Sequence, residues 1–421
     1  MAGNRPERVS PSHPGALAEP TGNVSAWWIG RFTLAWVGMF AGLFGPIQIL
    51  LPQQVEALAP AGKEAALAVV LGAGAAFSLV ANPLFGALSD RTTSRLGRRT
   101  PWIAGGFAGG AVAVGLLAAA PTIPALVLGW CAVQILLNAA YAGLSAVVPD
   151  QVPTRQRGTA AGYVGLALII GVGTGTGLAV LGGGTTLGYL ACALFMLVCA
   201  APYLLLRRDR VLEPADRPAW SRGAFLRGFW IDPRRHPDFG WAWLTRFLIN
   251  LGNSMSLLYL FFYLKDAVGV AEPGTAVLVA TAAYLAAMLA SVVLTGIWSD
   301  RVGRRRVFVC GGGLVMAAAA FLIAGWPTWT GVVAAAVVLG LGFGAYTSVD
   351  FALLTEVLPS STDRAKDLGV LNVASSLPQV LAPVVAAPVV TRLGGYPVLY
   401  AVAGAVGLTG AVLVYRITSV R

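Results

Sequence analysis

Charged residues are scarce in this chain. Only 11% of its 421 residues are Asp, Glu, Lys or Arg, whereas 57% are hydrophobic. Ordinary soluble domains carry about 25% charged residues. So little charge cannot cover the roughly two or three cores that a soluble chain of this length would need. The composition therefore excludes a soluble enzyme, a nucleic-acid-binding protein and a disordered chain.

Histidine and cysteine are also rare. His13 and His236 lie outside every apolar run, and the four cysteines lie inside such runs without disulfide or metal-ligand spacing. The Gly-rich stretch 171–177 lies within an apolar run and lacks the lysine and the strand–turn–helix context of a phosphate loop. We therefore expect no metal, no cofactor and no nucleotide-driven pumping.

Long apolar runs dominate the chain. A spanning helix needs about 20 predominantly apolar residues, and the sequence contains twelve such runs: 27–52, 65–88, 102–120, 123–148, 159–181, 187–206, 239–265, 275–298, 307–325, 329–355, 367–391 and 396–416. We predict an all-α membrane protein with twelve transmembrane helices in two pseudo-symmetric six-helix bundles. The predicted parts are a disordered cytoplasmic tail, a first bundle, a cytoplasmic linker and a second bundle: 1–24, 25–206, 207–238 and 239–421.

The basic residues predict the orientation. With a cytoplasmic N-terminus, every Lys and Arg except Lys63, Lys265 and Arg392 lies in or beside an inner loop or terminus, as the positive-inside rule expects. The net charge of +11 is therefore a topology signal and not a nucleic-acid site. Arg far outnumbers Lys, and Ala and Gly are abundant, which indicates a GC-rich bacterial genome. We expect a multi-pass protein of the bacterial inner membrane with both termini cytoplasmic.

The two groups of six helices repeat a loop signature. The first copy follows the second run and contains Gly86, Asp90, Arg91, Arg98 and Arg99. The second copy follows the eighth run and contains Gly296, Asp300, Arg301 and Arg304. Asp150 after the fourth run has Glu356 as its counterpart after the tenth, and Arg31 near the start of the first run matches Arg246 in the seventh. Repeated six-helix halves are typical of transporters that alternate access around a midplane site.

This doubled signature resembles the major facilitator superfamily. The resemblance implies that the signature residues of both loops, together with Asp150, form a cytoplasmic gate that latches the two halves through charge-assisted bonds. Narrower patches resemble sugar carriers. Asn82-Pro83 and residues 94–103 are similar to the glycoside–pentoside–hexuronide:cation symporters, and residues 46–54 and 369–379 are similar to the sucrose:proton symporters. These patches imply a sugar or glycoside as the solute.

The resemblance also bears on the coupling ion. The sodium-coupled sugar symporters carry carboxylates where this chain has Ser78, Asn82 and Tyr141. A cation site needs such counter-charge, so we expect coupling to protons in preference to sodium.

Several polar side chains fall within the apolar runs. Intramembrane polar groups tend to face the bundle interior or a wet cavity, and neutral amides and hydroxyls suit hydroxyl-rich ligands because they both donate and accept hydrogen bonds. The candidate substrate-binding residues are Gln48, Asn138, Tyr141, Asn250, Asn253, Asn372 and Gln379. The alternative is ordinary helix–helix hydrogen bonding, worth about 0.6 kcal/mol per contact in membranes.

Asp350 is the one acid that lies within a run and not at its end, and the equivalent position of the first half is near Leu144. Arg246 lies at about the same predicted depth, so the two side chains are expected to form an ion pair if their helices are neighbours. Separation of the pair would let Asp350 bind a proton in one state and release it in another, which makes both residues proton-coupling candidates. The alternative is a static pair that holds two helices together.

These features predict a secondary transporter and not an enzyme. The first hypothesis is proton-coupled import of a small polar solute, a sugar or glycoside, by alternating access. The alternative is proton-antiport export of drugs or secondary metabolites. Gly162, Gly171 and Gly175 have the spacing of the antiporter motif of drug exporters, but Thr176 replaces the proline that follows it, so close helix packing is favoured. The expected partners are the solute, protons and the lipid bilayer, with no nucleic acid and a monomeric chain.

Overall fold

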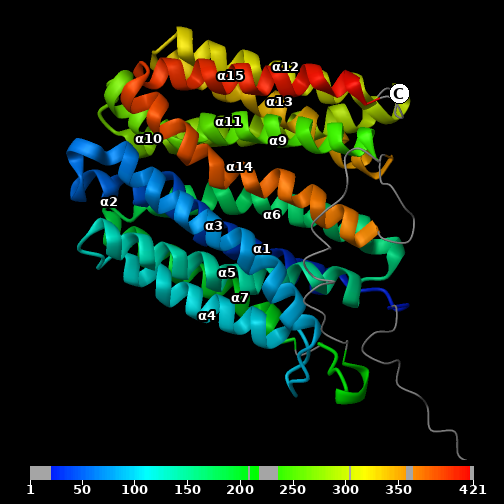
Figure 1. Ribbon diagram of the computed structural model, residues 1–421. Helices are drawn as coiled ribbons and strands as arrows, with labels where there is room; N and C mark the ends of the chain where they lie inside the picture. The colour runs from blue at the N-terminus through cyan, green and yellow to red at the C-terminus, as the bar shows by residue number, and fades with distance from the viewer. Residues whose placement is uncertain (1–19, 207–208, 218–235, 303–304, 357–363, 418–421) are drawn as a thin grey trace, which may run out of the picture.

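Helices make up nearly all of the described part of the chain (Figure 1). The computed structural model describes residues 20–206, 209–217, 236–302, 305–356 and 364–417, and these ranges contain no β-strand. The long helices are α1 (Ala26–Gly45), α3 (Lys63–Asp90), α4 (Thr100–Leu117), α5 (Ile123–Gln151), α6 (Thr154–Leu181), α7 (Thr185–Leu204), α9 (Pro237–Leu258), α11 (Pro273–Val302), α12 (Arg305–Gly325), α13 (Trp329–Glu356), α14 (Arg364–Arg392) and α15 (Gly395–Leu413). The short helical segments are η1 (Pro46–Leu50), α2 (Leu51–Leu58), η2 (Pro60–Gly62), η3 (Pro214–Asp216), α10 (Leu260–Phe262), η4 (Tyr263–Ala267) and η5 (Val414–Arg416).

The helices agree with the predicted spans. In the described ranges, eleven helices are long and apolar enough to cross a membrane, and a bent pair brings the number to twelve. That pair consists of α9 and the segment 260–267, which meet at an angle of 41°. The all-α architecture predicted from the apolar runs is therefore confirmed.

The first span is longer than predicted. The sequence placed its end at residue 52, but the helix continues through η1 and α2 to Leu58. Pro46 and Pro52 lie inside this continuous helix without ending it, and the π-helical turn η1 that begins at Pro46 is the kind of local adjustment by which membrane helices tolerate proline. η1 and η4 are both π-helical turns, at corresponding places in the two halves, and such turns are often found at functional sites.

The helix contacts repeat between the halves. In the first half α3 packs on α5, α5 on α4, α4 on α7, α7 on α1 and α1 on α6. In the second half the same order is α11 on α13, α13 on α12, α12 on α15, α15 on α9 and α9 on α14. The halves meet where α3 packs on α14 and α6 packs on α11, and in Figure 1 α6 and α14 lie between the two groups. The repeat seen in the loops therefore extends to the three-dimensional packing.

Glycines on α6 allow a very close approach to α1. A Cβ on Gly171 would lie 2.8 Å from the carbonyl oxygen of Val37, and one on Gly175 would lie 2.5 Å from that of Ala41. A Cβ on Gly162 would meet no atom within 4 Å. Two of the three motif-like glycines therefore serve helix packing, which is how small residues associate membrane helices.

Candidate functional site

A buried ion pair lies within the second half. Asp350 of α13 is only 6% exposed, and its Oδ2 forms an ion pair with Nη1 of Arg246 on α9. Nε of Arg246 also donates a hydrogen bond of 2.6 Å to the hydroxyl of Ser375 on α14. The backbone of α9 packs on α14 and α15, so the long Arg246 side chain is what reaches α13. The predicted pair is thus formed and links three helices, while its role in coupling remains a prediction.

Two further side chains complete this group. The amide of Asn250 donates to the carbonyl of Arg246 at 2.8 Å and to the hydroxyl of Tyr346 at 3.2 Å. Tyr346, 2% exposed, lies on α13 as Asp350 does. We call Arg246, Asn250, Tyr346, Asp350 and Ser375 the acid–base cluster. Tyr346 was not among the predicted site residues, although it stands one helical turn before Asp350, on the same face of the helix.

The candidates of the first half are engaged in local contacts. Asn138 of α5 donates to the hydroxyl of Ser78 on α3 at 2.8 Å and to the carbonyl of Gln134 at 2.7 Å. Tyr141 lies edge-on against Trp36 of α1, with ring centroids 4.9 Å apart. These contacts match the helix–helix alternative for Asn138, and they place Tyr141 in an aromatic group.

Gln48 connects the two halves. Its side-chain oxygen, presented by the π-helical turn η1, accepts hydrogen bonds from Thr176 of α6 at 3.0 Å and from Thr281 of α11 at 3.1 Å. The sequence marked Gln48 as a ligand candidate but could not show that its partners come from both halves.

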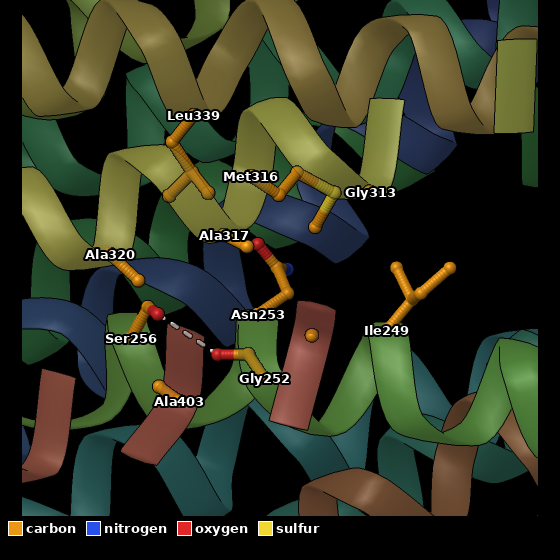
Figure 2. Close-up of a pocket in the computed structure, with 11 residues that line it drawn as sticks. Ile249, Gly252, Asn253, Ser256, Gly313, Met316, Ala317, Ala320, Leu339 and Ala403 are labelled. Carbon is orange, nitrogen blue, oxygen red and sulfur yellow. Dashed lines mark hydrogen bonds between the residues drawn. The ribbon is translucent and has the colours of Figure 1, made fainter. Parts of the chain in front are cut away.

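Of the other three candidates, Asn253 and Gln379 have different surroundings. Asn253 lines a small cavity of about 10 Å³ with residues of α12, α13 and α15, and its side-chain oxygen is buried without a hydrogen-bond partner (Figure 2). Gln379 of α14 is exposed. Asn372 lies in α14, but its side chain is outside the described part of the chain. The structure therefore does not gather all the predicted ligands at one point.

The loop signature of the first half forms a compact network of charges. Asp150 binds Nη2 of Arg98 at 2.6 Å and Nε of Arg99 at 2.7 Å, and Asp90 binds Nη2 of Arg99 at 2.6 Å. Arg99, with its side chain only 4% exposed, also donates to the hydroxyl of Ser89. Burial opposes its charge, but the hydrogen bond and charges of Asp150 and Asp90 more than offset this, so the pKa of Arg99 is raised. These bonds join parts of one half, whereas the predicted latch runs between halves.

The other predicted gate residues have fewer described contacts. Gly86 has open space beside it, as has Gly296 in α11. Arg91 takes part in an interaction, and Arg301 is exposed. The side chain of Asp300 and the whole of Arg304 lie outside the described residues.

The linker contributes an acid that the sequence did not single out. Oδ2 of Asp209 accepts hydrogen bonds from the backbone N–H groups of Arg99 and Thr100, at 2.5 and 2.7 Å, and so caps the N-terminus of α4. Gly97 has φ +101°, and a Cβ there would lie 2.5 Å from Asp209. Gly97, directly before Arg98 of the signature, is thus required both by its backbone conformation and by the linker acid.

A second charged group joins the halves at the end assigned to the outside. We call Glu56, Lys63, Glu64, Lys265, Asp266 and Tyr396 the outer cluster. Nζ of Lys63 lies 2.7 Å from Glu56 and 2.8 Å from Asp266, and Nζ of Lys265 lies 2.7 Å from Glu56. Because Asp266 and Lys265 belong to the second half, these bonds hold that end closed, and Figure 1 shows α2 and α10 at this end, away from the C-terminus. The sequence placed the two lysines outside but gave no sign of their partners.

Comparisons with known proteins identify the fold and family. A sequence model of the Major Facilitator Superfamily matches residues 28–280 and 271–421. The crystal structure of the nucleoside transporter NupG superimposes with a TM-score of 0.72 at 13% identity, covering 93% of this chain and 99% of that one. At this identity the likeness concerns the fold alone.

Two curated relatives match part of the chain. Multidrug resistance protein MdtL of Shewanella oneidensis is 32% identical over 31% of this chain and 32% of its own length. The MdtL of Shigella flexneri is 37% identical over 25% of this chain and 27% of its own length. The matched segments thus span a third or less of these relatives, and the names of both refer to drug resistance.

Proposed function

The chain belongs to the Major Facilitator Superfamily and is a multi-pass membrane transporter, and we propose that it exports small amphipathic molecules in exchange for protons. The observation that carries the proposal is the buried pair of Arg246 and Asp350 within the second half. Translocon scales put a central Arg or Asp at about 2.5–3.5 kcal/mol each, and such residues often mark proton pathways.

The cluster has the chemistry of a proton carrier. Asp350 is paired with Arg246 of another helix, and Tyr346 stands one turn before it on α13. While Arg246 is close, its charge favours the ionised carboxylate; when the helices separate, Asp350 loses that charge and favours the protonated form. Ser375 gives Arg246 an alternative partner on α14. A proton is thus bound in the state where the pair is apart and released where the pair forms.

Aromatic rings next to this cluster favour an amphipathic solute. The rings of Tyr284 and Phe343 have centroids 6.3 Å apart, and those of Phe343 and Tyr346 are 6.2 Å apart. Aromatic faces bind apolar and cationic organic molecules. The names of the two matched relatives also favour drug export. The predicted amide ligands do not all lie at one place, which weakens the case for a single site that binds a hydroxyl-rich solute.

Import of a sugar or glycoside with protons is the second candidate. Gln48, Thr176 and Thr281 favour it, because they bring an amide and two hydroxyls from both halves together. A hydroxyl-rich solute could replace these mutual hydrogen bonds with its own. For either function we expect the protein to lie in a bacterial inner membrane with both termini cytoplasmic. We also expect it to be a monomer and to couple transport to protons and not to sodium.

Proteoliposomes separate the two candidates. We expect ethidium to move against its gradient when a proton gradient of the opposite direction is imposed, and labelled sucrose, melibiose and xylose not to move. Accumulation of one of these sugars along the proton gradient, with no movement of ethidium, would replace export by import. Replacing the proton gradient with a sodium gradient is the control, and transport driven by sodium would contradict proton coupling.

A further inference from the structure

Helix α4 begins after a residue that cannot cap it. Its N-cap is Arg99, whose side chain makes no capping hydrogen bond, because a guanidinium has donors and no acceptor. Helices are usually capped by Ser, Thr, Asp or Asn, whose side-chain oxygen accepts from the first free N–H groups. The Arg99 guanidinium instead binds Asp150 and Asp90. The helix must therefore take its acceptor from another part of the chain.

The linker supplies that acceptor. Oδ2 of Asp209 accepts hydrogen bonds from the N–H groups of Arg99 and Thr100, at 2.5 and 2.7 Å, and from the hydroxyl of Thr100 at 3.1 Å. The carbonyl oxygen of the next residue, Arg210, accepts from the N–H of Arg98 at 3.1 Å. Two successive linker residues thus hold the backbone of three successive residues, and two of these are the arginines of the loop signature.

The same part of the linker is seated among helices of the first half. Asp209 lines a small cavity of about 10 Å³ together with Trp28 of α1, Gln151 of α5 and Tyr203 of α7. Leu212, three residues further on, is fully buried. The carboxylate of Asp209 is therefore held in place from several sides, as a group that positions other residues needs to be.

We propose that Asp209 is a positioning residue of the predicted cytoplasmic gate, fixing the backbone of Arg98 and Arg99 so that both guanidinium groups meet Asp150. Both arginine side chains are buried, and their ion pairs with Asp150 are 2.6 and 2.7 Å long. A backbone shift of about 1 Å would take such pairs out of hydrogen-bond range. The inference rests on the predicted gate and does not depend on which solute the transporter carries.

Hydrogen–deuterium exchange of the full chain in lipid nanodiscs tests the cap itself. Asp209→Ala removes the acceptor, and we expect the N–H groups of residues 97–103 to exchange roughly five- to thirtyfold faster, as the loss of a helix cap implies. Asp209→Asn keeps an oxygen at the same place and should keep most of the protection. Glu213→Ala is the matched control, because Glu213 is an exposed acid of the same segment whose side chain caps no helix.

Distances between spin labels connect the cap to the gate without a substrate. Labels at Thr93→Cys and Val302→Cys, both exposed beside the signature loops of opposite halves, report the cytoplasmic opening. The buried native cysteines are replaced by alanine: Cys131, Cys192, Cys199 and Cys310. Asp209→Ala should lower the population of the short distance, because arginines that are not held in place close the gate less often. Asp209→Asn and Glu213→Ala should give the wild-type distribution.

Transport in proteoliposomes gives a third measurement. Asp209→Ala should lower the maximal rate severalfold and leave KM unchanged, because the gate acts in the conformational step and not in solute binding. Asp209→Asn should restore the rate. A cap that only stabilises α4 would change the exchange of residues 97–103 and neither the distances nor the rate.

The outcomes separate this inference from the proposed function. Unchanged exchange in Asp209→Ala would overturn the cap, and faster exchange with wild-type distances would overturn the positioning role. Failure of the wild-type protein to transport ethidium would contradict the proposed export of amphipathic molecules. The exchange and distance measurements would still decide the role of Asp209, because neither needs a solute.

Discussion

The two halves have the same helix contacts, but the charged groups that the structure describes in them lie in different places. In the first half Arg98, Arg99 and Asp150 meet at the ends of helices, next to the loops. In the second half Arg246 and Asp350 meet between α9 and α13 within the bundle. The position in the first half that corresponds to Asp350 is near Leu144, which is fully buried. Internal repetition thus builds the scaffold, and departures from it mark where the two halves do different work.

The ion pair at Asp350, which the first half lacks at the corresponding position, costs more free energy than a purely structural contact between helices needs to. A helix pair can be held by small residues or by neutral hydrogen bonds, as α1 and α6 are held at Gly171 and Gly175. Replacing a buried ion pair by apolar groups is often neutral or stabilising. Retention of an acid and a base at this depth is therefore better explained by a charge that changes partner during transport.

The largest expected effect on stability is at the acid–base cluster. Arg246→Ala leaves Asp350 buried without its cation and should lower the free energy of unfolding by about 3–5 kcal/mol. The double variant Arg246→Ala/Asp350→Ala removes both charges and should lose less. Unfolding in detergent, followed by tryptophan fluorescence, measures both, with Ser375→Ala as the control that removes one hydrogen bond. A loss in the double variant equal to the sum of the losses in Arg246→Ala and Asp350→Ala alone would show that the two charges are not coupled.

The charge network of the first half should be more sensitive at Asp150 than at Asp90. Asp150→Asn deprives two buried arginines of their acid, and we expect a loss of about 2–3 kcal/mol together with impaired transport. Asp90 is 53% exposed, so Asp90→Asn should cost under about 1 kcal/mol while still slowing transport. Asp300→Asn tests the second copy of the signature in the same assay. Wild-type transport in Asp90→Asn or Asp300→Asn would remove that loop from the gate.

Close packing of α1 and α6 is expected to contribute less to stability than the buried ion pair. Gly175→Ala puts a Cβ 2.5 Å from a backbone oxygen of α1, and the two helices must move apart at a cost of about 1–3 kcal/mol. Gly162→Ala meets no atom within 4 Å on the same helix and should be neutral or slightly stabilising. Thermal unfolding of the two purified variants compares them. Equal melting temperatures would show that the helices separate here without cost.

Much of the scaffold could be predicted from the sequence. The lengths of the apolar runs predicted the membrane spans. The doubled loop signature predicted the repeat that the helix contacts show. Arg246 and Asp350 were paired because the number of residues from the cytoplasmic helix end gives both side chains about the same depth in the membrane. These predictions succeed because each depends only on the local sequence and on the position of the membrane surface, which all spans share.

The rest depended on neighbours that the local sequence does not specify. Asn250 and Asn253 were both predicted substrate ligands, but Asn250 bonds Tyr346 whereas Asn253 lines a separate cavity. The outer cluster joins residues about two hundred positions or more apart, such as Lys63 and Asp266. No periodicity within one helix reports which helix of the other half will face it.

The most direct test concerns Asp350 as the carrier of the coupling proton. Asp350→Asn keeps the size of the side chain but cannot take up and release a proton at neutral pH. In proteoliposomes we expect this variant to lose accumulation of ethidium driven by a proton gradient, and to retain exchange of labelled for unlabelled ethidium at equal concentrations. Loss of accumulation with exchange retained would place the coupling at Asp350. Accumulation against a gradient by Asp350→Asn would contradict the account, even with the rest of the cluster in place.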